Sequence, residues 1–372
     1  MKNTFGSALT VTLFGESHGE SIGAVLDGLA PGIPIDEGHI AARLARRRPK
    51  DDLSTGRREP DEFRILSGAW QGHTTGTPLT ILIPNTRQHS ADYATDSFLP
   101  RPGHADYAGY CKYHGYEDRR GGGHFSGRLT AALVAAAAII EPALSRAGIC
   151  IGTRISQVAG VEDTCPLTPD DLPRLTQMDF PVLDAEAGIR MIKAIRAAAE
   201  DGDSVGGILE TLVSGLPAGL GEPWFDTVEG ELSKLLFSVP AVKGVEFGDG
   251  FGFATLRGST ANDPFAIRDG RIVTLTNRNG GINGGITNGM PLRFRVVVKP
   301  TPSIFKPQRT ADPITLQEKT LTLHGRHDPA ILHRAAPVVE AVTALGLADL
   351  ITRRYGTDLL ACPDRLREEA TP

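Results

Sequence analysis

The feature that most constrains the fold is a set of short segments that occurs twice in the same order. Residues 20–32 contain Glu-Ser-Ile-Gly, then Gly-Leu and a further Gly, and residues 203–219 carry the same pattern with Asp-Ser-Val-Gly at its start. Residues 72–79 are matched in the same way by residues 285–292, since each run begins with Gly and ends in Gly-x-Pro-Leu. Single turn sequences of this kind are common and could recur by chance, but their shared order favours a duplicated strand–helix–strand unit.

This recurrence predicts one domain, residues 1–372, built from two similar halves at about 1–150 and 190–355. Each half ends in a long apolar segment that predicts a buried helix, at about 126–146 and 330–353. The predicted strands are separated by hairpin-type turns as often as by helices. That alternation favours antiparallel sheets with helices packed between them over a doubly wound parallel sheet.

One helix of the first half has clear boundaries. Residues 36–48 have an amphipathic pattern, with Asp36 as a plausible N-cap and Pro49 directly after the end. Leu44 and the stem of Arg47 fall near the same face. A basic segment begins within this helix, because residues 43–64 contain eight Lys and Arg against five Asp and Glu. Guanidinium groups suit bidentate binding of phosphate or carboxylate, although a solvated helix end is an equal alternative.

Composition argues against several classes of protein. The chain has 39 Lys and Arg against 44 Asp and Glu, a formal net charge of −5, whereas nucleic-acid-binding domains are usually basic. No apolar run reaches the roughly 18–20 residues that span a bilayer, and Met1–Thr10 lacks the pattern of a secretory signal. None of the four cysteines forms a CxxC pair, which fits a reducing cytoplasm. We therefore expect a cytoplasmic protein that binds neither nucleic acid nor membrane.

Six loops combine glycine or proline with His, Arg, Lys or Asn. A Gly-rich loop before a helix presents unpaired N–H groups to an anion, and a loop histidine can transfer protons near neutral pH. Residues 118–128 fit the first description and His18 fits the second, although an exposed histidine without a role is an alternative. The six loops are 15–19, 101–107, 118–128, 277–289, 299–303 and 324–329. They predict that both halves meet at a site for an anionic small molecule.

Motifs for other kinds of site are absent. There is no GxxxxGK[ST] phosphate loop, no HExxH zinc motif and no GxGxxG between a strand and a helix. His324 and His327 are three residues apart, but no acidic or cysteine pattern accompanies them, so no metal site is predicted.

Seven motifs taken together resemble those of chorismate synthases. They occur in the family's order, and the resemblance covers about residues 5–353, nearly the whole chain. The motifs are GESHG (15–19), RPGHADY (101–107), the Gly-Gly-Gly loop with Ser126 and Arg128, PAVKGVEFGDGF (240–251), GGINGGITNGMP (280–291), KPTPSI (299–304) and GRHDP (325–329). Each alone is a modest signal, whereas seven in order are very hard to obtain by chance.

The resemblance implies a reaction and a fold. Chorismate synthases eliminate phosphate from 5-enolpyruvylshikimate 3-phosphate in a 1,4-anti sense to give chorismate, the last step of the shikimate pathway. They need reduced FMN although there is no net redox change. The family fold is an α+β sandwich of antiparallel sheets around packed helices with an internal pseudo-twofold repeat, assembled as a homotetramer. We expect the same fold, carbon–oxygen lyase activity, cofactor and assembly here.

The resemblance also assigns roles to residues. His18 matches the histidine near the leaving phosphate, His104 the one that protonates the reduced flavin, and Asp328 the acid near flavin N5. Arg47 and Arg128 match arginines of the anion-binding site. Flavin contacts are implied for His124, Phe125, Ser126, Pro240, Ala241, Gly284, Lys299, Pro300, Thr301, Pro302, Ser303 and Arg326.

Two departures from the family pattern affect these expectations. His124-Phe125 stands where many members have Arg-Ser, which affects the flavin contacts implied there. Lys50-Asp51-Asp52 stands where members that reduce their own flavin often have an arginine linked to the nicotinamide cofactor, NADP. We therefore expect a monofunctional enzyme that receives reduced flavin from an external reductant.

Two other classes of function stay open at this point. One is a flavin-dependent oxidoreductase on the same scaffold, which would consume stoichiometric reductant where a lyase does not. The other is a non-catalytic anion- or nucleic-acid-binding module, which the acidic composition disfavours.

Overall fold

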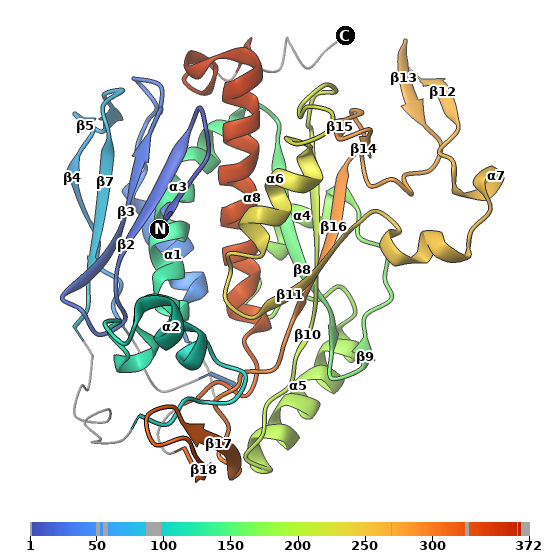
Figure 1. The fold of residues 1–372 in the computed structure, drawn as a ribbon. Coiled ribbons are helices and arrows are strands. Elements are labelled where there is room, and N and C mark those ends of the chain that lie inside the picture. The colour runs from blue at the N-terminus through green and yellow to red at the C-terminus, as the bar shows by residue number, and fades with distance from the viewer. Residues whose placement is uncertain are drawn as a thin grey trace.

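Two five-stranded antiparallel sheets face each other across a layer of long helices (Figure 1). This computed structural model describes residues 2–49, 53–54, 59–86, 98–268, 270–323, 327–362 and 364–365. In the first sheet, of order β1-β2-β3-β7-β4, the strands are β1 (Thr4–Phe5), β2 (Thr10–Gly15), β3 (Ser21–Asp27), β7 (Leu79–Pro84) and β4 (Arg64–Ser67). In the second, of order β11-β16-β10-β8-β9, they are β11 (Val242–Phe247), β16 (Leu292–Val298), β10 (Gly207–Ser214), β8 (Cys150–Val158) and β9 (Val161–Glu162).

The central layer is formed by helices from both halves of the chain. These helices are α1 (Glu37–Arg47), α3 (Thr130–Arg146), α6 (Val228–Leu236) and α8 (Leu332–Tyr355). In the described part of the chain, the other α-helices of more than one turn are α2 (Asp106–Tyr113) and α5 (Ala185–Glu200). Four short hairpins extend the loops: β5–β6 (Ala69–Trp70, His73–Thr74), β12–β13 (Phe265–Arg268, Arg271–Thr274), β14–β15 (Ile282–Asn283, Ile286–Thr287) and β17–β18 (Gln308–Asp312, Gln317–Leu321). The predicted α+β sandwich with helices between antiparallel sheets is confirmed.

Helix α1 begins and ends where its sequence predicts. The Asp36 side chain accepts a hydrogen bond from the backbone N–H of His39 at 2.9 Å, so it caps the helix. The helix ends at Arg47, two residues before Pro49. Its face toward α3 and α8 carries Ile40 and Leu44, which are fully buried.

Helices α3 and α8 form the core of the molecule. They pack against each other along runs rich in alanine, whose small side chains let two helix backbones approach closely. By length and composition, Gly127–Arg146 and Leu332–Tyr355 could each cross a membrane, although neither is an uninterrupted apolar run. They are 83% and 100% buried inside the protein, as expected of core helices.

The two sheets have the same order of elements along the chain and in space. Each half begins with a central antiparallel pair, β2–β3 or β8–β10, which is followed by a helix, α1 or α6. An edge strand comes next, β4 or β11, and then a strand that pairs between the edge strand and the central pair, β7 or β16. A long core helix, α3 or α8, ends each half. The short β9 and helices α4 (Leu172–Leu175) and α5 are additions of the second half.

A buried threonine makes the same contacts in both halves. Its hydroxyl donates to the carbonyl of one residue and accepts from the N–H of the residue three positions after that one. The threonine thereby holds the turn that follows β3 in the first half and β10 in the second. The contacts are Thr74 to Ala30 O (2.6 Å) and from Ile33 N (2.9 Å), and Thr287 to Pro217 O (2.7 Å) and from Leu220 N (2.9 Å). The division into two related halves remains a prediction, and these matches support it.

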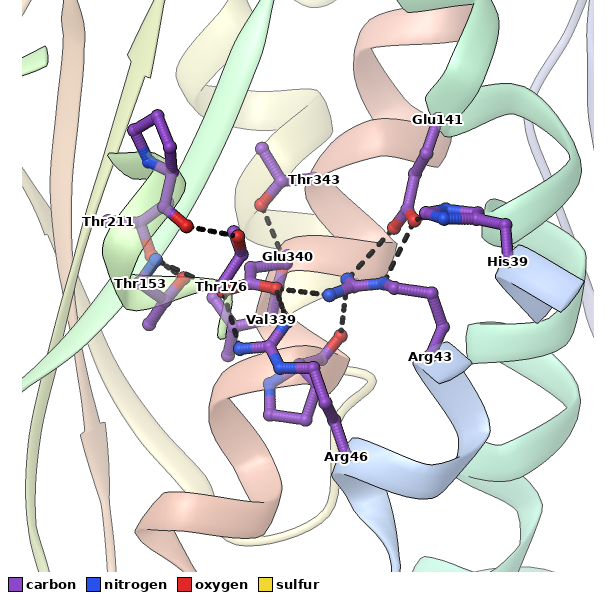
Figure 2. Close-up of polar contacts among 12 residues, drawn as sticks. His39, Arg43, Arg46, Glu141, Thr153, Thr176, Thr211, Val339, Glu340 and Thr343 are labelled. Carbon is purple, nitrogen blue, oxygen red and sulfur yellow. Dashed lines mark hydrogen bonds and ion pairs between the residues drawn. The ribbon is translucent and has the colours of Figure 1, made fainter. Parts of the chain in front are cut away.

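A buried ion-pair network joins α1 to both core helices (Figure 2). Arg43 and Arg46 each lie 2.6 Å from the same oxygen of Glu340 on α8, and Arg43 also pairs with Glu141 on α3 at 2.9 Å. Burial disfavours the charge on Glu340, but the two arginines outweigh it and hold the pKa of this carboxyl below its ordinary value. Part of the basic segment predicted to bind anions therefore stabilises the core instead.

Candidate active site

Two adjoining cavities open between the halves, one of about 300 Å³ and one of about 880 Å³. They share lining residues from both halves, so they lie side by side. The shared residues are Gly121, Ser126, Gly127, Thr130, Val239, Pro240, His327, Asp328 and Ile331. The predicted meeting of loops from both halves at one site is therefore observed.

The smaller cavity is strongly cationic. Five arginines line it, against the two carboxylates Glu59 and Asp328, and the arginines are Arg47, Arg48, Arg101, Arg128 and Arg334. Arginines gathered around one cavity provide fixed positive charge for an anion with several oxygens. A phosphorylated dicarboxylate such as the expected substrate fits this chemistry.

Two of these arginines share one buried carboxylate. Arg47 lies 3.2 Å from Oδ2 of Asp61, and Arg128 donates to Oδ1 of the same group. Burial, together with the nearby charges of Arg334 and Arg128, lowers the pKa of Arg47 to about 10 despite Asp61, so Arg47 remains a cation at neutral pH. Arg128 is fixed further because its Nε donates to Oδ1 of Asn85 at 2.9 Å.

Arg334 connects this pair to Asp328. Nη1 of Arg334 lies 2.5 Å from Oδ2 of Asp328, and its Nε donates to the backbone carbonyl of Arg47 at 3.1 Å. Because Asp328 stands directly before Pro329, which favours the first position of a helix, it could serve as the N-cap of the last helix, but the structure contradicts that interpretation. Helix α8 starts at Leu332 with Ile331 at the cap position, because the chain continues past Pro329 for two residues before it turns into the helix.

The larger cavity is mostly apolar, with some polar groups in its lining. Its apolar lining includes Leu129 and Leu133 of the first half and Phe237 of the second. Its polar lining includes His104, His124, Ser126, Lys299, Thr301 and Ser303. A planar aromatic group with a polar edge suits such a space.

His104 is held by a neighbouring carboxylate. Its Nδ1 lies 2.6 Å from Oδ1 of Asp106, whose other oxygen is 2.7 Å from Nε of Arg101. Burial opposes ionisation of Asp106, but the hydrogen bonds from Arg101 and His104 outweigh it and hold the pKa of Asp106 well below its ordinary value. An imidazole fixed through Nδ1 keeps Nε2 for proton exchange with a ligand.

The Gly-rich loop at 120–125 separates His18 from the cavities. Gly121, Gly122 and Gly123 all have positive φ, and a side chain on Gly121 would overlap the ring of His18. His18 is 5% exposed and lines neither cavity.

Residues 15–19 also fit the GxSxG pattern of serine hydrolases. They connect the antiparallel strands β2 and β3 rather than a strand and a helix, so the pattern does not indicate a hydrolase here.

Comparison with known proteins decides the family. The sequence profile described as chorismate synthase matches residues 9–352. A chorismate synthase from Thermococcus gammatolerans is 49% identical over 350 residues, which is 94% of this chain and 97% of that protein. One from Dehalococcoides mccartyi is 45% identical over 354 residues, which is 95% of this chain and 97% of that protein.

The chain belongs to the chorismate synthase family. A crystal structure of chorismate synthase superposes with a TM-score of 0.75 at 26% sequence identity, covering 99% of this chain and 100% of that chain. The protein is therefore a carbon–oxygen lyase that converts 5-enolpyruvylshikimate 3-phosphate into chorismate and phosphate.

Most residues expected from the family to contact the flavin gather at the larger cavity. Those that line it are His124, Phe125, Ser126, Pro240, Ala241, Lys299, Thr301, Pro302 and Ser303. Nδ1 of His124 donates to the carbonyl of Gly15 at 2.8 Å, so the imidazole ring is tied to the GESHG loop. Pro300, between Lys299 and Thr301 in sequence, packs over Gly206 and does not line the cavity.

Another expected flavin contact of the chorismate synthase pattern, Gly284, is not brought to the cavity. Gly284 lies at the exposed tip of the β14–β15 hairpin, next to the N-terminus of α6, whereas the cavity adjoins the C-terminal end of that helix. Glycines 280, 281 and 285 of this loop fit tightly against backbone or side chains of the chain itself, which accounts for them without a ligand. Arg326 lies outside the described residues, as does Lys50-Asp51-Asp52.

Sequence reasoning missed four site residues: Arg101, Asp106, Asp61 and Arg334. Arg101 and Asp106 belong to the RPGHADY motif beside His104, so the motif itself carried a signal for them. Asp61 is an acidic residue inside a basic segment, a weak signal. Arg334 has no local signal, because its partners Arg47 and Asp328 come together only in the fold.

Proposed function

We propose that the elimination takes place where the two cavities meet, with the phosphorylated substrate in the smaller cavity and reduced FMN in the larger one. The observation that carries this placement is the contrast between the cavities: five arginines line the smaller, and the larger is mostly apolar. Because the cavities share lining residues, ligands bound in both would lie next to each other, as a reaction that depends on both requires.

On the substrate side, the arginines bind the phosphate and keep it bound as its negative charge grows. Fixed cations in an enclosed site stabilise a departing phosphate more than water does, since they need no reorganisation. Arg47 and Arg128 are held in place from behind by Asp61, and Arg334 by Asp328.

On the flavin side, residues of both halves fit the cofactor. Leu129, Leu133 and Phe237 would lie against the isoalloxazine ring, and Lys299 and Ser303 near its polar groups. Reduced FMN supplies a transient electron donor that eases cleavage of the C–O bond. His104, held by Asp106, would present Nε2 for proton exchange with the bound flavin, and Asp328, which lines both cavities, would accept a proton there. His18 acts near the leaving phosphate from behind the Gly-rich loop.

We further propose a cytoplasmic homotetramer that receives reduced flavin from an external reductant. Exposed aromatic side chains remote from the cavities, among them Phe225, Phe251 and Phe265, offer apolar surface for contacts between subunits. All four cysteines are unpaired, which fits a reducing compartment.

The deciding experiment is an anaerobic assay with photoreduced FMN. Phosphate release and chorismate absorbance should rise together without stoichiometric consumption of reductant, and oxidised FMN should support neither. Two variants test the placement of the ligands: Leu133→Trp should weaken FMN binding, and Arg334→Gln should weaken phosphate binding. The opposite pattern would overturn the placement.

A further inference from the structure

Asp61 occupies an unusual position for a carboxylate. Its side chain is fully buried, and each of its oxygens meets a different arginine of the smaller cavity. Asp61 itself does not line the cavity, so it approaches Arg47 and Arg128 from the protein side while a ligand approaches from the other. Burial alone would favour its neutral form, but the two arginines hold the pKa of Asp61 below its ordinary value.

The contacts of Asp61 form the middle of a continuous polar chain across the site. Nδ2 of Asn85 donates to the Glu16 and Gly19 carbonyls of the GESHG loop at 3.0 and 2.9 Å, and Oδ1 of Asn85 accepts from Arg128. On the other side of Asp61, the backbone carbonyl of Arg47 accepts a hydrogen bond from Nε of Arg334. Arg334 in turn pairs with Asp328. Asp61 is the carboxylate that lies between Arg47 and Arg128, whose side chains are 6% and 5% exposed.

We propose that Asp61 is an internal counter-anion that sets the phosphate affinity of the smaller cavity. Arg47 and Arg128 both pair with Asp61 from buried positions, and a buried charge that loses its partner is strongly destabilising. Asp61 supplies that charge when no ligand is bound. When phosphate binds, the same two cations are shared between Asp61 and the phosphate, so each holds the phosphate less tightly. This arrangement lets the product phosphate leave. The inference rests on the proposed placement of phosphate in the smaller cavity.

The test compares Asp61→Asn with a matched control, Glu340→Gln. Both substitutions remove one buried negative charge that bridges two arginines, but Arg43 and Arg46, the partners of Glu340, line neither cavity. Thermal midpoints and inorganic phosphate affinities are measured for both variants and the wild type. Both variants should be less stable than wild type in phosphate-free buffer.

Only Asp61→Asn should be rescued by the anion. Inorganic phosphate should bind it at least tenfold more tightly than wild type, about 1.4 kcal/mol, and should restore most of its lost thermal midpoint. Phosphate should leave the Glu340→Gln deficit unchanged. In turnover, the KM of Asp61→Asn for the phosphorylated substrate should fall together with kcat, and inhibition by product phosphate should strengthen.

The outcomes separate this inference from the placement on which it rests. If wild type binds phosphate and Asp61→Asn binds it equally or more weakly, Asp61 is no counter-anion, although the smaller cavity is still the phosphate site. If Arg334→Gln leaves wild-type phosphate affinity unchanged, the placement itself is wrong. Should Asp61→Asn be unfolded without phosphate, the proposal requires phosphate to recover folded protein, and failure to do so overturns it.

Discussion

Nδ1 of His104 and Oδ1 of Asp106 lie 2.6 Å apart at the edge of the larger cavity. This pair comes from a single turn of chain, Arg101 to Asp106, in which Arg101 also holds the carboxylate. The motif thus builds an oriented imidazole locally and presents it to a space formed by both halves.

Replacing the imidazole should affect rate much more than binding. We expect His104→Ala to bind FMN and substrate normally but to lose roughly 10²–10⁴-fold in turnover, the usual scale for a lost general acid or base. The measurement is anaerobic turnover with reduced FMN, with the exposed His73→Ala as control. Near-native turnover would remove His104 from the mechanism.

Asp106 should contribute to stability in a pH-dependent way. Its pKa in the folded protein lies below the ordinary value, so its ionised form stabilises the fold above about pH 4, and this contribution is lost as pH falls further. Asp106→Asn should therefore be less stable than wild type at neutral pH, and the difference should shrink below about pH 4. Urea unfolding from pH 7 to pH 3 measures it; a constant difference would contradict the assignment.

Asp328 should matter for both stability and rate. Asp328 pairs with Arg334 and does not cap α8, so an Asn there keeps no capping hydrogen bond. Asp328→Asn therefore only weakens the contact with Arg334. We expect a loss of about 1–3 kcal/mol in unfolding free energy. We also expect turnover at least roughly tenfold lower, about 1.4 kcal/mol of barrier. Both are measured on one preparation, and lowered stability with unchanged turnover would assign Asp328 to the ion pair alone.

The source of reduced flavin can be tested directly. Because Lys50-Asp51-Asp52 replaces an arginine often found in self-sufficient family members, NADPH plus FMN under anaerobic conditions should give no turnover. Dithionite-reduced FMN should restore it in the same sample. Sustained turnover with NADPH would show that this protein reduces its own flavin.

The Gly-rich loop should not tolerate a side chain at its third glycine. A Cβ on Gly123 would lie 1.8 Å from the Asp118 carbonyl oxygen, and φ there is +53°, so Gly123→Ala should cost at least about 2 kcal/mol. Gly127→Ala is the control, since no atom lies within 4 Å of its Cβ position, and it should stay within about 1 kcal/mol of wild type. Equal thermal midpoints for the two variants would contradict the constraint.

The sequence by itself determined the elements whose signals are local. Asp36 and Pro49 bounded α1, and long, mainly apolar segments predicted the buried helices α3 and α8. The repeated turn pattern predicted antiparallel sheets. These signals are local because caps, turns and periodicity act over a few residues. The RPGHADY motif carried its own histidine, carboxylate and arginine for the same reason.

Only the tertiary structure decided which charged groups face the ligand. Arg43, Arg46 and Arg47 are alike in sequence, yet the first two pair with Glu340, about 300 residues away, and Arg47 turns toward the cavity. The direction of each side chain depends on which partner the opposite half presents, and no local pattern encodes that partner. Asp328 likewise pairs with Arg334 instead of capping a helix, because the balance between a cap and an ion pair is settled by packing between the halves.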